Sequence, residues 1–137
     1  MNLSTVEWNV ETVKYWLSTA AMVDRSLPPV MPPKVSGQKW NIIREWYELL
    51  WDKDEDIKPH MQPTNEQISM WEEVVLRWFR LIDSDKDKKI VWMRACGVSY
   101  SRIGKKIGLS RQTLTIRYNN AINTLVVSLN NFYHKIG

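Results

Sequence analysis

Residues 99–118 decide the fold, and they read SYSRIGKKIGLSRQTLTIRY. Ser99 and Ser110 each stand where a helix would begin, and a serine hydroxyl at such a position accepts a hydrogen bond from an open backbone amide. Gly108 can adopt the positive φ that ends the first helix. Gly104 lies where the next helix must cross closely, and only a very small side chain permits that approach. These capping and turn residues predict two helices joined by a short turn.

The apolar residues of the same stretch have helical spacing. Ile103 and Ile107 are expected to face inward from the first helix, and Leu109 fills the angle between the helices. The inward residues expected on the second helix are Leu114, Tyr118, Ala121 and Leu125. Caps, turn and apolar spacing therefore all predict a helix-turn-helix, with an ordinary αα-hairpin as the alternative.

Basic residues are concentrated around this motif. Residues 1–82 contain 9 basic and 12 acidic side chains, whereas residues 83–137 contain 10 basic and 3 acidic ones. No acidic residue follows Asp87. This asymmetry is typical of a nucleic-acid-binding segment attached to a more acidic body, with a solvated basic surface as the alternative. The motif and the charge together favour a second helix that enters the DNA major groove.

The residues expected to contact double-stranded DNA lie on the outward faces of both helices. Arg111 is suited to guanine, Gln112 to adenine and Ile116 to a thymine methyl group. Other members, such as Lys105 and Arg117, are suited to backbone phosphates. The full predicted set is Arg102, Lys105, Lys106, Arg111, Gln112, Thr113, Thr115, Ile116, Arg117 and Asn120.

The motif resembles region 4 of sigma-70-type transcription factors. The order and spacing of residue types match that region in three segments, which are residues 97–104 (GVSYSRIG), 108–114 (GLSRQTL) and 117–121 (RYNNA). The resemblance covers residues 85–129, about a third of the chain. It implies a sigma-like protein that binds promoter DNA and regulates transcription.

A more specific resemblance extends outside the motif. Residues 91–97 (VWMRACG), residues 27–29 (LPP) and Trp40 are similar to a group of small alphaproteobacterial sigma-like proteins. Those proteins occur as separate chains or as the C-terminal half of the transcription activators of gene transfer agents, which are phage-derived particles. The resemblance implies contact with RNA polymerase, with its omega subunit as a candidate, and activation of phage-derived genes. The chain has no match to a promoter-melting region, so a second activator subunit is expected to supply the missing parts.

The rest of the chain also reads as helical, which predicts an all-α fold of about six helices. Helices are expected after Asn9, over residues 39–50, after the capping box Thr64–Gln67, and from Asp85 to Gly97. All six Pro lie between residues 28 and 63, in two connections. We predict a Trp-rich helical body over residues 1–82 and a basic helix-turn-helix domain over 83–137, packed as one compact unit.

Eight Trp is several times the usual number for a chain of 137 residues. Those on apolar helical stripes are expected in the core, namely Trp16, Trp46, Trp71 and Trp78. Trp8, Trp40 and Trp51 lie near expected helix ends and are candidate partner-binding residues, because aromatic side chains often anchor protein interfaces.

Several function classes find no support in the sequence. The single Cys96 cannot form an internal disulfide, and His60 and His134 lack zinc-site spacing. Residues 52–63 and 83–94 lack the Gly and Glu that calcium loops require at their sixth and twelfth places. No phosphate loop, nucleophile elbow, secretory signal or membrane-length apolar run is visible. We therefore expect a cytoplasmic protein that is not an enzyme and needs no metal or cofactor.

Three functions remain open at this point. The first is a sigma-like transcription activator that binds DNA through the motif and a protein partner through the body. The second is a phage-type small terminase subunit that packages DNA. The third is a protein–protein module in which the motif binds RNA polymerase without touching DNA.

Overall fold

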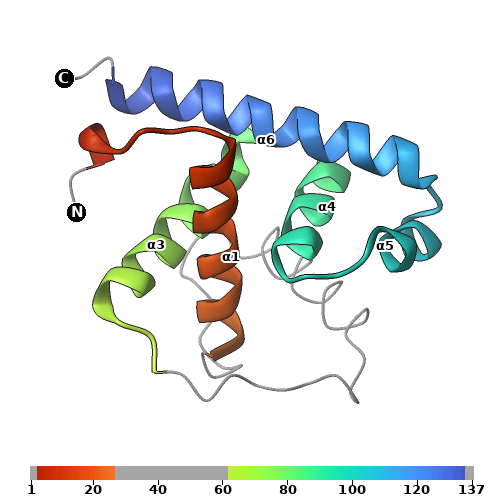
Figure 1. The fold of residues 1–137 in the computed structure, drawn as a ribbon, viewed down its shortest axis with the longest axis horizontal. Helices are drawn as coiled ribbons and strands as arrows, with labels where there is room; N and C mark the ends of the chain where they lie inside the picture. Colours follow the sequence, from red (N-terminus) through yellow and green to blue (C-terminus); the bar gives the residue numbers. More distant parts are fainter. Residues whose placement is uncertain (1–2, 27–61, 135–137) are drawn as a thin grey trace.

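The computed structural model describes residues 3–26 and 62–134, and this part of the chain is helical without any strand (Figure 1). The prediction of an all-α fold is therefore confirmed. The helix expected over residues 39–50, together with Trp40, Trp46 and Trp51, lies outside the described residues. The elements are η1 (Leu3–Thr5), α1 (Val10–Ser26), α3 (Asn65–Leu76), η3 (Trp78–Leu81), α4 (Asp85–Ala95), α5 (Tyr100–Ile107) and α6 (Arg111–His134).

Local side-chain chemistry starts and ends these helices as predicted. Asn9 Oδ1 accepts a hydrogen bond from the backbone N–H of Thr12 at 2.9 Å, at the start of α1. Thr64 and Gln67 form the predicted capping box, with side chain–backbone distances of 3.1 and 3.0 Å. Gly97, with φ of 86°, follows α4 and reverses the chain. These helix starts and stops are confirmed.

The third predicted stripe divides between two elements. Its first residues lie on α3, which ends at Leu76, whereas Trp78 and Phe79 lie in the 3-10 helix η3. Both aromatic side chains are nevertheless buried. The tighter winding of a 3-10 helix changes the direction of the side chains within one turn, so the apolar pattern continues while the α-helix does not.

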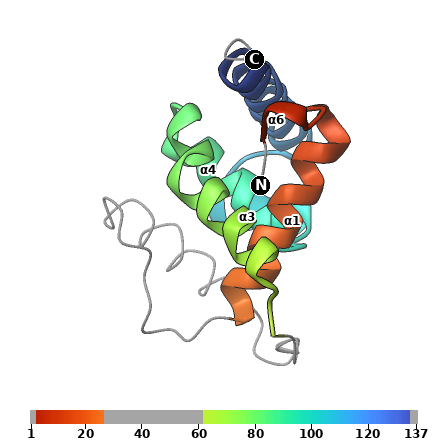
Figure 2. The ribbon, with the colours of Figure 1, turned by 90° about the vertical axis from the view of Figure 1, so that its left-hand side faces the viewer.

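The long helix α6 organises the fold. It runs across one end of α1, α3 and α4, with α5 beside its N-terminal end and η1 near its C-terminal end (Figures 1 and 2). α1 packs most extensively against α3, and α6 contacts α1, α4, α5, η1 and η3. None of the described helices is long and apolar enough to cross a membrane. The N-terminal end of α6 is thus held at one edge of the molecule.

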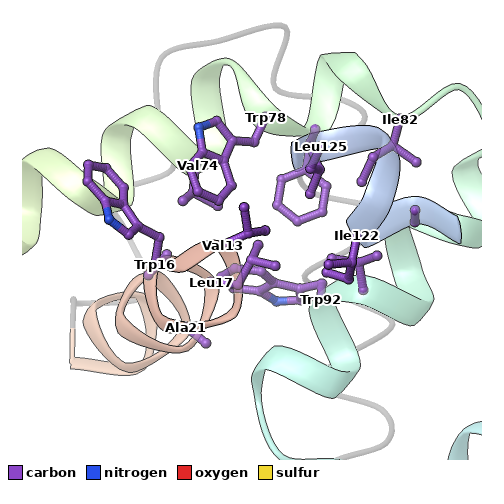
Figure 3. Close-up of a cluster of buried hydrophobic side chains, with 14 of the residues drawn as sticks. Val13, Trp16, Leu17, Ala21, Val74, Trp78, Ile82, Trp92, Ile122 and Leu125 are labelled. Atoms are coloured by element: carbon purple, nitrogen blue, oxygen red, sulfur yellow. The ribbon is translucent and has the colours of Figure 1, made fainter. Parts of the chain in front are cut away.

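One continuous core joins the two predicted parts of the chain. Figure 3 shows side chains of α1, α4, α6 and the α3–η3 segment pointing toward one another. Trp78 and Trp92 are fully buried in it, together with Leu125 of α6. Buried residues from both sides of residue 82 belong to the same hydrophobic cluster. Burial of such large aromatic surfaces gives a small fold much of its hydrophobic stabilisation.

Trp16, Trp71 and Trp78 are core residues, as predicted, but the prediction that Trp8 is exposed for a partner is wrong. Trp8 is only 3% exposed. Its ring lies 5.1 Å from that of Trp16 and 5.4 Å from that of Trp78, both edge-on. The side-chain amide of Asn130 donates a hydrogen bond to the carbonyl oxygen of Trp8 at 3.0 Å, which ties this segment to α6. A helix-end position therefore does not expose Trp8, because the chain before α1 folds over the aromatic core.

Tyr133 gives the C-terminal end of α6 a pH-dependent contact. Its hydroxyl donates a hydrogen bond to Glu73 Oε1 on α3. Burial, followed by this hydrogen bond, raises the pKa of Tyr133 to about 12 from a usual value of 10.0. Because the folded-state pKa is raised, the contact stabilises the fold fully below pH 10, and this contribution is lost as the pH rises toward 12.

Tyr133→Phe is expected to lower the melting temperature at pH 8 and to match the wild type near pH 12. Thermal unfolding of both proteins across this pH range, followed by circular dichroism, measures the difference. Tyr15→Phe, at a tyrosine that is 64% exposed, is the control and should show no such trend. A gap between Tyr133→Phe and the wild type that stays constant with pH would contradict the assignment.

Candidate nucleic-acid interface

The helix-turn-helix formed by α5, the following turn and α6 has the predicted local structure. Ser99 Oγ accepts a hydrogen bond from the backbone N–H of Arg102 at 3.3 Å, at the start of α5. Ser110 Oγ accepts one from the N–H of Thr113 at 3.2 Å, at the start of α6. Gly108 ends α5 with φ of 80°, the left-handed conformation that favours glycine. The two helix starts and the turn are confirmed.

Gly104 is required by the turn and not by the next helix, which corrects one expectation. A Cβ at this position would lie 2.7 Å from the backbone oxygen of Leu109, in the turn. It would lie 3.4 Å from Leu114 Cδ1 on α6, which is close to ordinary contact. The chain folds back over α5 before α6 begins, so the carbonyl of the turn makes the closest approach.

Aromatic and basic side chains fix the motif against the body. Leu114, Tyr118, Ala121 and Leu125 of α6 are buried, as predicted. Tyr118 packs edge-on against Tyr100, and Lys14 Nζ of α1 lies 5.5 Å from the centre of the Tyr118 ring. Burial and the neighbouring Tyr100 raise the pKa of Tyr118. These contacts tie the N-terminal half of α6 to both α1 and α5.

The predicted DNA-contacting residues differ in their exposure. Ile116 is 53% exposed on α6. Arg102, Thr113, Thr115 and Arg117 are half-buried. The exposed members of the set are Lys105, Lys106, Arg111, Gln112, Ile116 and Asn120. These six lie on α5 and the first three turns of α6.

The two threonines of the set already take part in hydrogen bonds within the helix. Ser110 Oγ donates to Thr113 Oγ1 at 2.9 Å, and Thr115 Oγ1 donates to the carbonyl oxygen of Arg111 at 2.9 Å. Both hydroxyls therefore support the first turns of α6. In the described structure the hydroxyls of Thr113 and Thr115 therefore bind groups of Ser110 and Arg111 at the start of α6.

Two asparagines extend the outward face beyond the predicted set. Gln112, Ile116, Asn119 and Asn123 follow one another at intervals of four, three and four residues, which places them on one face of α6. Asn119 and Asn123 are exposed. Asparagine amides can pair with adenine in the major groove. Their spacing from Ile116 is the signal that would have identified them in the sequence.

Arg117 lies on the flank of α6 and has a partner from another helix. Its Nη1 donates to Asp87 Oδ1 of α4 at 3.2 Å. The residues are 30 positions apart, so no local pattern indicated the pair. Arg117 was predicted to contact a DNA phosphate. In the structure the carboxylate of Asp87 already occupies its guanidinium, so any phosphate contact would be made beside this carboxylate.

The electrostatic character of this face follows from its residues. The described residues after Asp87 include no acid, and Lys105, Lys106 and Arg111 project exposed cations from α5 and the start of α6. The N-terminal end of α6 adds the partial positive charge of its open amides. Within the described ranges no group of His, Cys, Asp and Glu side chains could hold a metal ion. The face is suited to a polyanion.

Residues 25–125 match a protein family described as "Domain of unknown function (DUF6362)". The chain belongs to this family. The DUF6362 match includes α3, η3, α4, α5 and α6 as far as Leu125, so it contains the whole helix-turn-helix and its outward residues. No curated protein and no solved structure shows a significant match to the chain.

Proposed function

We propose that this protein is a sigma-like transcription activator that binds promoter DNA through α5 and α6 and contacts RNA polymerase. The observation that carries the proposal is a capped helix-turn-helix whose outward face presents Lys105, Lys106, Arg111 and Gln112. The described residues after Asp87 include no acidic side chain. The resemblance of residues 85–129 to sigma region 4 supports the same function.

The recognition step uses the N-terminal turns of α6. An α-helix about 10–12 Å across fits the major groove of B-DNA, which is about 12 Å wide. Arg111 and Gln112, in the first turn, then reach base edges, and Ile116 one turn later reaches a thymine methyl group. Lys105 and Lys106 on α5 lie alongside and bind phosphates, which adds affinity without sequence information.

The inner face of α6 packs against the rest of the protein, and its outward face remains exposed. α1, α4 and η3 pack against α6, and their buried apolar side chains share one hydrophobic cluster with those of α6. In the proposed mechanism a further surface of the protein binds RNA polymerase, with the omega subunit as the candidate contact. A second activator subunit supplies promoter melting, and the genes activated are those of a gene transfer agent or another phage-derived element.

Arg111→Ala and Lys105→Ala are expected to affect DNA binding differently. Loss of Arg111 should reduce discrimination between a selected site and a scrambled duplex by about 1–3 kcal/mol. Loss of Lys105 should weaken both duplexes about equally and reduce the salt dependence of log K by about 0.9. The site is first selected from random duplexes, and affinities are then measured by fluorescence anisotropy at several salt concentrations.

Arg80→Ala, which removes an exposed cation in η3 outside the helix-turn-helix, is the matched control and should change neither quantity appreciably. Absence of DNA binding by the wild type at low salt would overturn the proposed function. A pull-down from host extract that enriches RNA polymerase subunits supports the activator. A ring-shaped oligomer on a sizing column, without polymerase, would instead favour DNA packaging.

A further inference from the structure

The ion pair between Asp87 and Arg117 joins α4 to the proposed recognition helix. Arg117 Nη1 lies 3.2 Å from Asp87 Oδ1, and the side chains are 39% and 26% exposed. The pair is therefore partly shielded from water but still reaches the surface. It neutralises one of the cations of the acid-free segment beside the face that is proposed to meet DNA.

The carboxylate is held in place by its own helix. Asp87 lies in the first turn of α4, where the helix dipole favours a negative charge. Its backbone N–H donates to the Ser84 Oγ cap at 3.4 Å. The neighbouring Asp85 pairs instead with Lys88 on the same helix, at 3.5 Å. Among these acids, Asp87 is the one whose described ion pair crosses to α6.

Arg117 occupies a flank of α6 from which it could reach phosphate. It lies one residue after exposed Ile116 and one residue before buried Tyr118, so it sits between the outward and inward faces. Cations at the flanks of a recognition helix meet the phosphates that line the groove. With Asp87 beside it, Arg117 presents an ion pair of zero net charge to those phosphates.

We propose that Asp87 is a specificity-determining residue that acts through Arg117 by lowering sequence-independent affinity for DNA phosphates. This inference rests on the proposed DNA binding. Phosphate contacts raise affinity for every duplex, whereas base contacts raise it for one site. A carboxylate that offsets one phosphate-binding cation therefore increases the ratio of specific to non-specific binding.

Asp87→Asn tests this role on a scrambled duplex. Removing the carboxylate should tighten binding about threefold to tenfold at 100 mM salt and steepen the salt dependence of log K by about 0.9, the effect of one further neutralised phosphate. Asp87→Glu keeps the charge and should stay within about twofold of wild type. Glu66→Gln makes the same charge change at an exposed position in the first turn of α3, and it should have no comparable effect.

The same substitution in an Arg117→Gln background isolates the pair. There Asp87→Asn should lose most of its effect, because no guanidinium remains to be released. An equal effect in both backgrounds, an effect no larger than that of Glu66→Gln, or weaker binding by Asp87→Asn would each overturn the inference. If the wild type binds DNA, only the role of Asp87 then fails. If neither the wild type nor any variant binds DNA at low salt, the proposed function fails and this inference with it.

Discussion

Trp78→Ala is expected to lower the free energy of unfolding by about 3–5 kcal/mol, the usual cost of removing a buried aromatic ring. Trp78 has no exposed surface. Its ring stacks on that of Trp16, with centres 5.6 Å apart and planes 21° apart, and meets Trp8 edge-on. Removal of the Trp78 ring would therefore leave a large cavity beside the indoles of Trp16, on α1, and of Trp8, in the segment before α1.

Urea unfolding followed by far-UV circular dichroism measures this loss without interference from the other Trp. Tyr15→Ala removes an aromatic ring that is 64% exposed on α1 and should change stability by less than about 0.5 kcal/mol. Trp78→Phe should cost less than Trp78→Ala, because phenylalanine keeps an aromatic ring in the site and leaves a smaller cavity. The indole N–H that both variants lose has no hydrogen-bond partner among the described residues. A loss below 1 kcal/mol for Trp78→Ala would show that the core closes around the cavity.

Gly104→Ala is expected to destabilise the protein by about 1–3 kcal/mol, the range for overpacking a close contact. Intrinsic helix propensity acts in the opposite direction, because alanine is favoured over glycine by about 1 kcal/mol in a helix. The added Cβ would lie 2.7 Å from the backbone oxygen of Leu109. This oxygen belongs to the turn that positions α6, so it cannot move away as the end of a flexible side chain could. The collision therefore outweighs the gain in propensity.

Ser101→Ala is the matched control, because Ser101 is exposed on the same helix and the change likewise leaves alanine there. The two variants are compared by thermal and urea unfolding. Greater stability of Gly104→Ala than of the wild type would contradict the expected collision and show that the turn accommodates a side chain.

Local features of this fold were readable from the sequence because their chemistry acts within one helical turn. The Thr64 capping box and the Ser99 and Ser110 caps each join groups three residues apart. Gly108 is placed by the backbone conformation of its own position. The apolar spacing of α6 likewise repeats every three or four residues. Helix starts, the turn and the inward face of the motif could therefore be predicted, and so could the outward face that carries Lys105 and Arg111.

Contacts between distant segments required the packed fold. Asn130 reaches the Trp8 carbonyl across 122 positions, and Tyr133 reaches Glu73 across 60. Neither these contacts nor the Asp87–Arg117 pair follows from residue spacing, because the separation along the chain says nothing about which helix faces will meet. The burial of Trp8 and the approach of the Leu109 carbonyl to Gly104 depend on the same packing. Caps and periodicity were thus properties of the chain itself, whereas the environment of Trp8 and the charge presented by Arg117 arise only where α6 lies across the other helices.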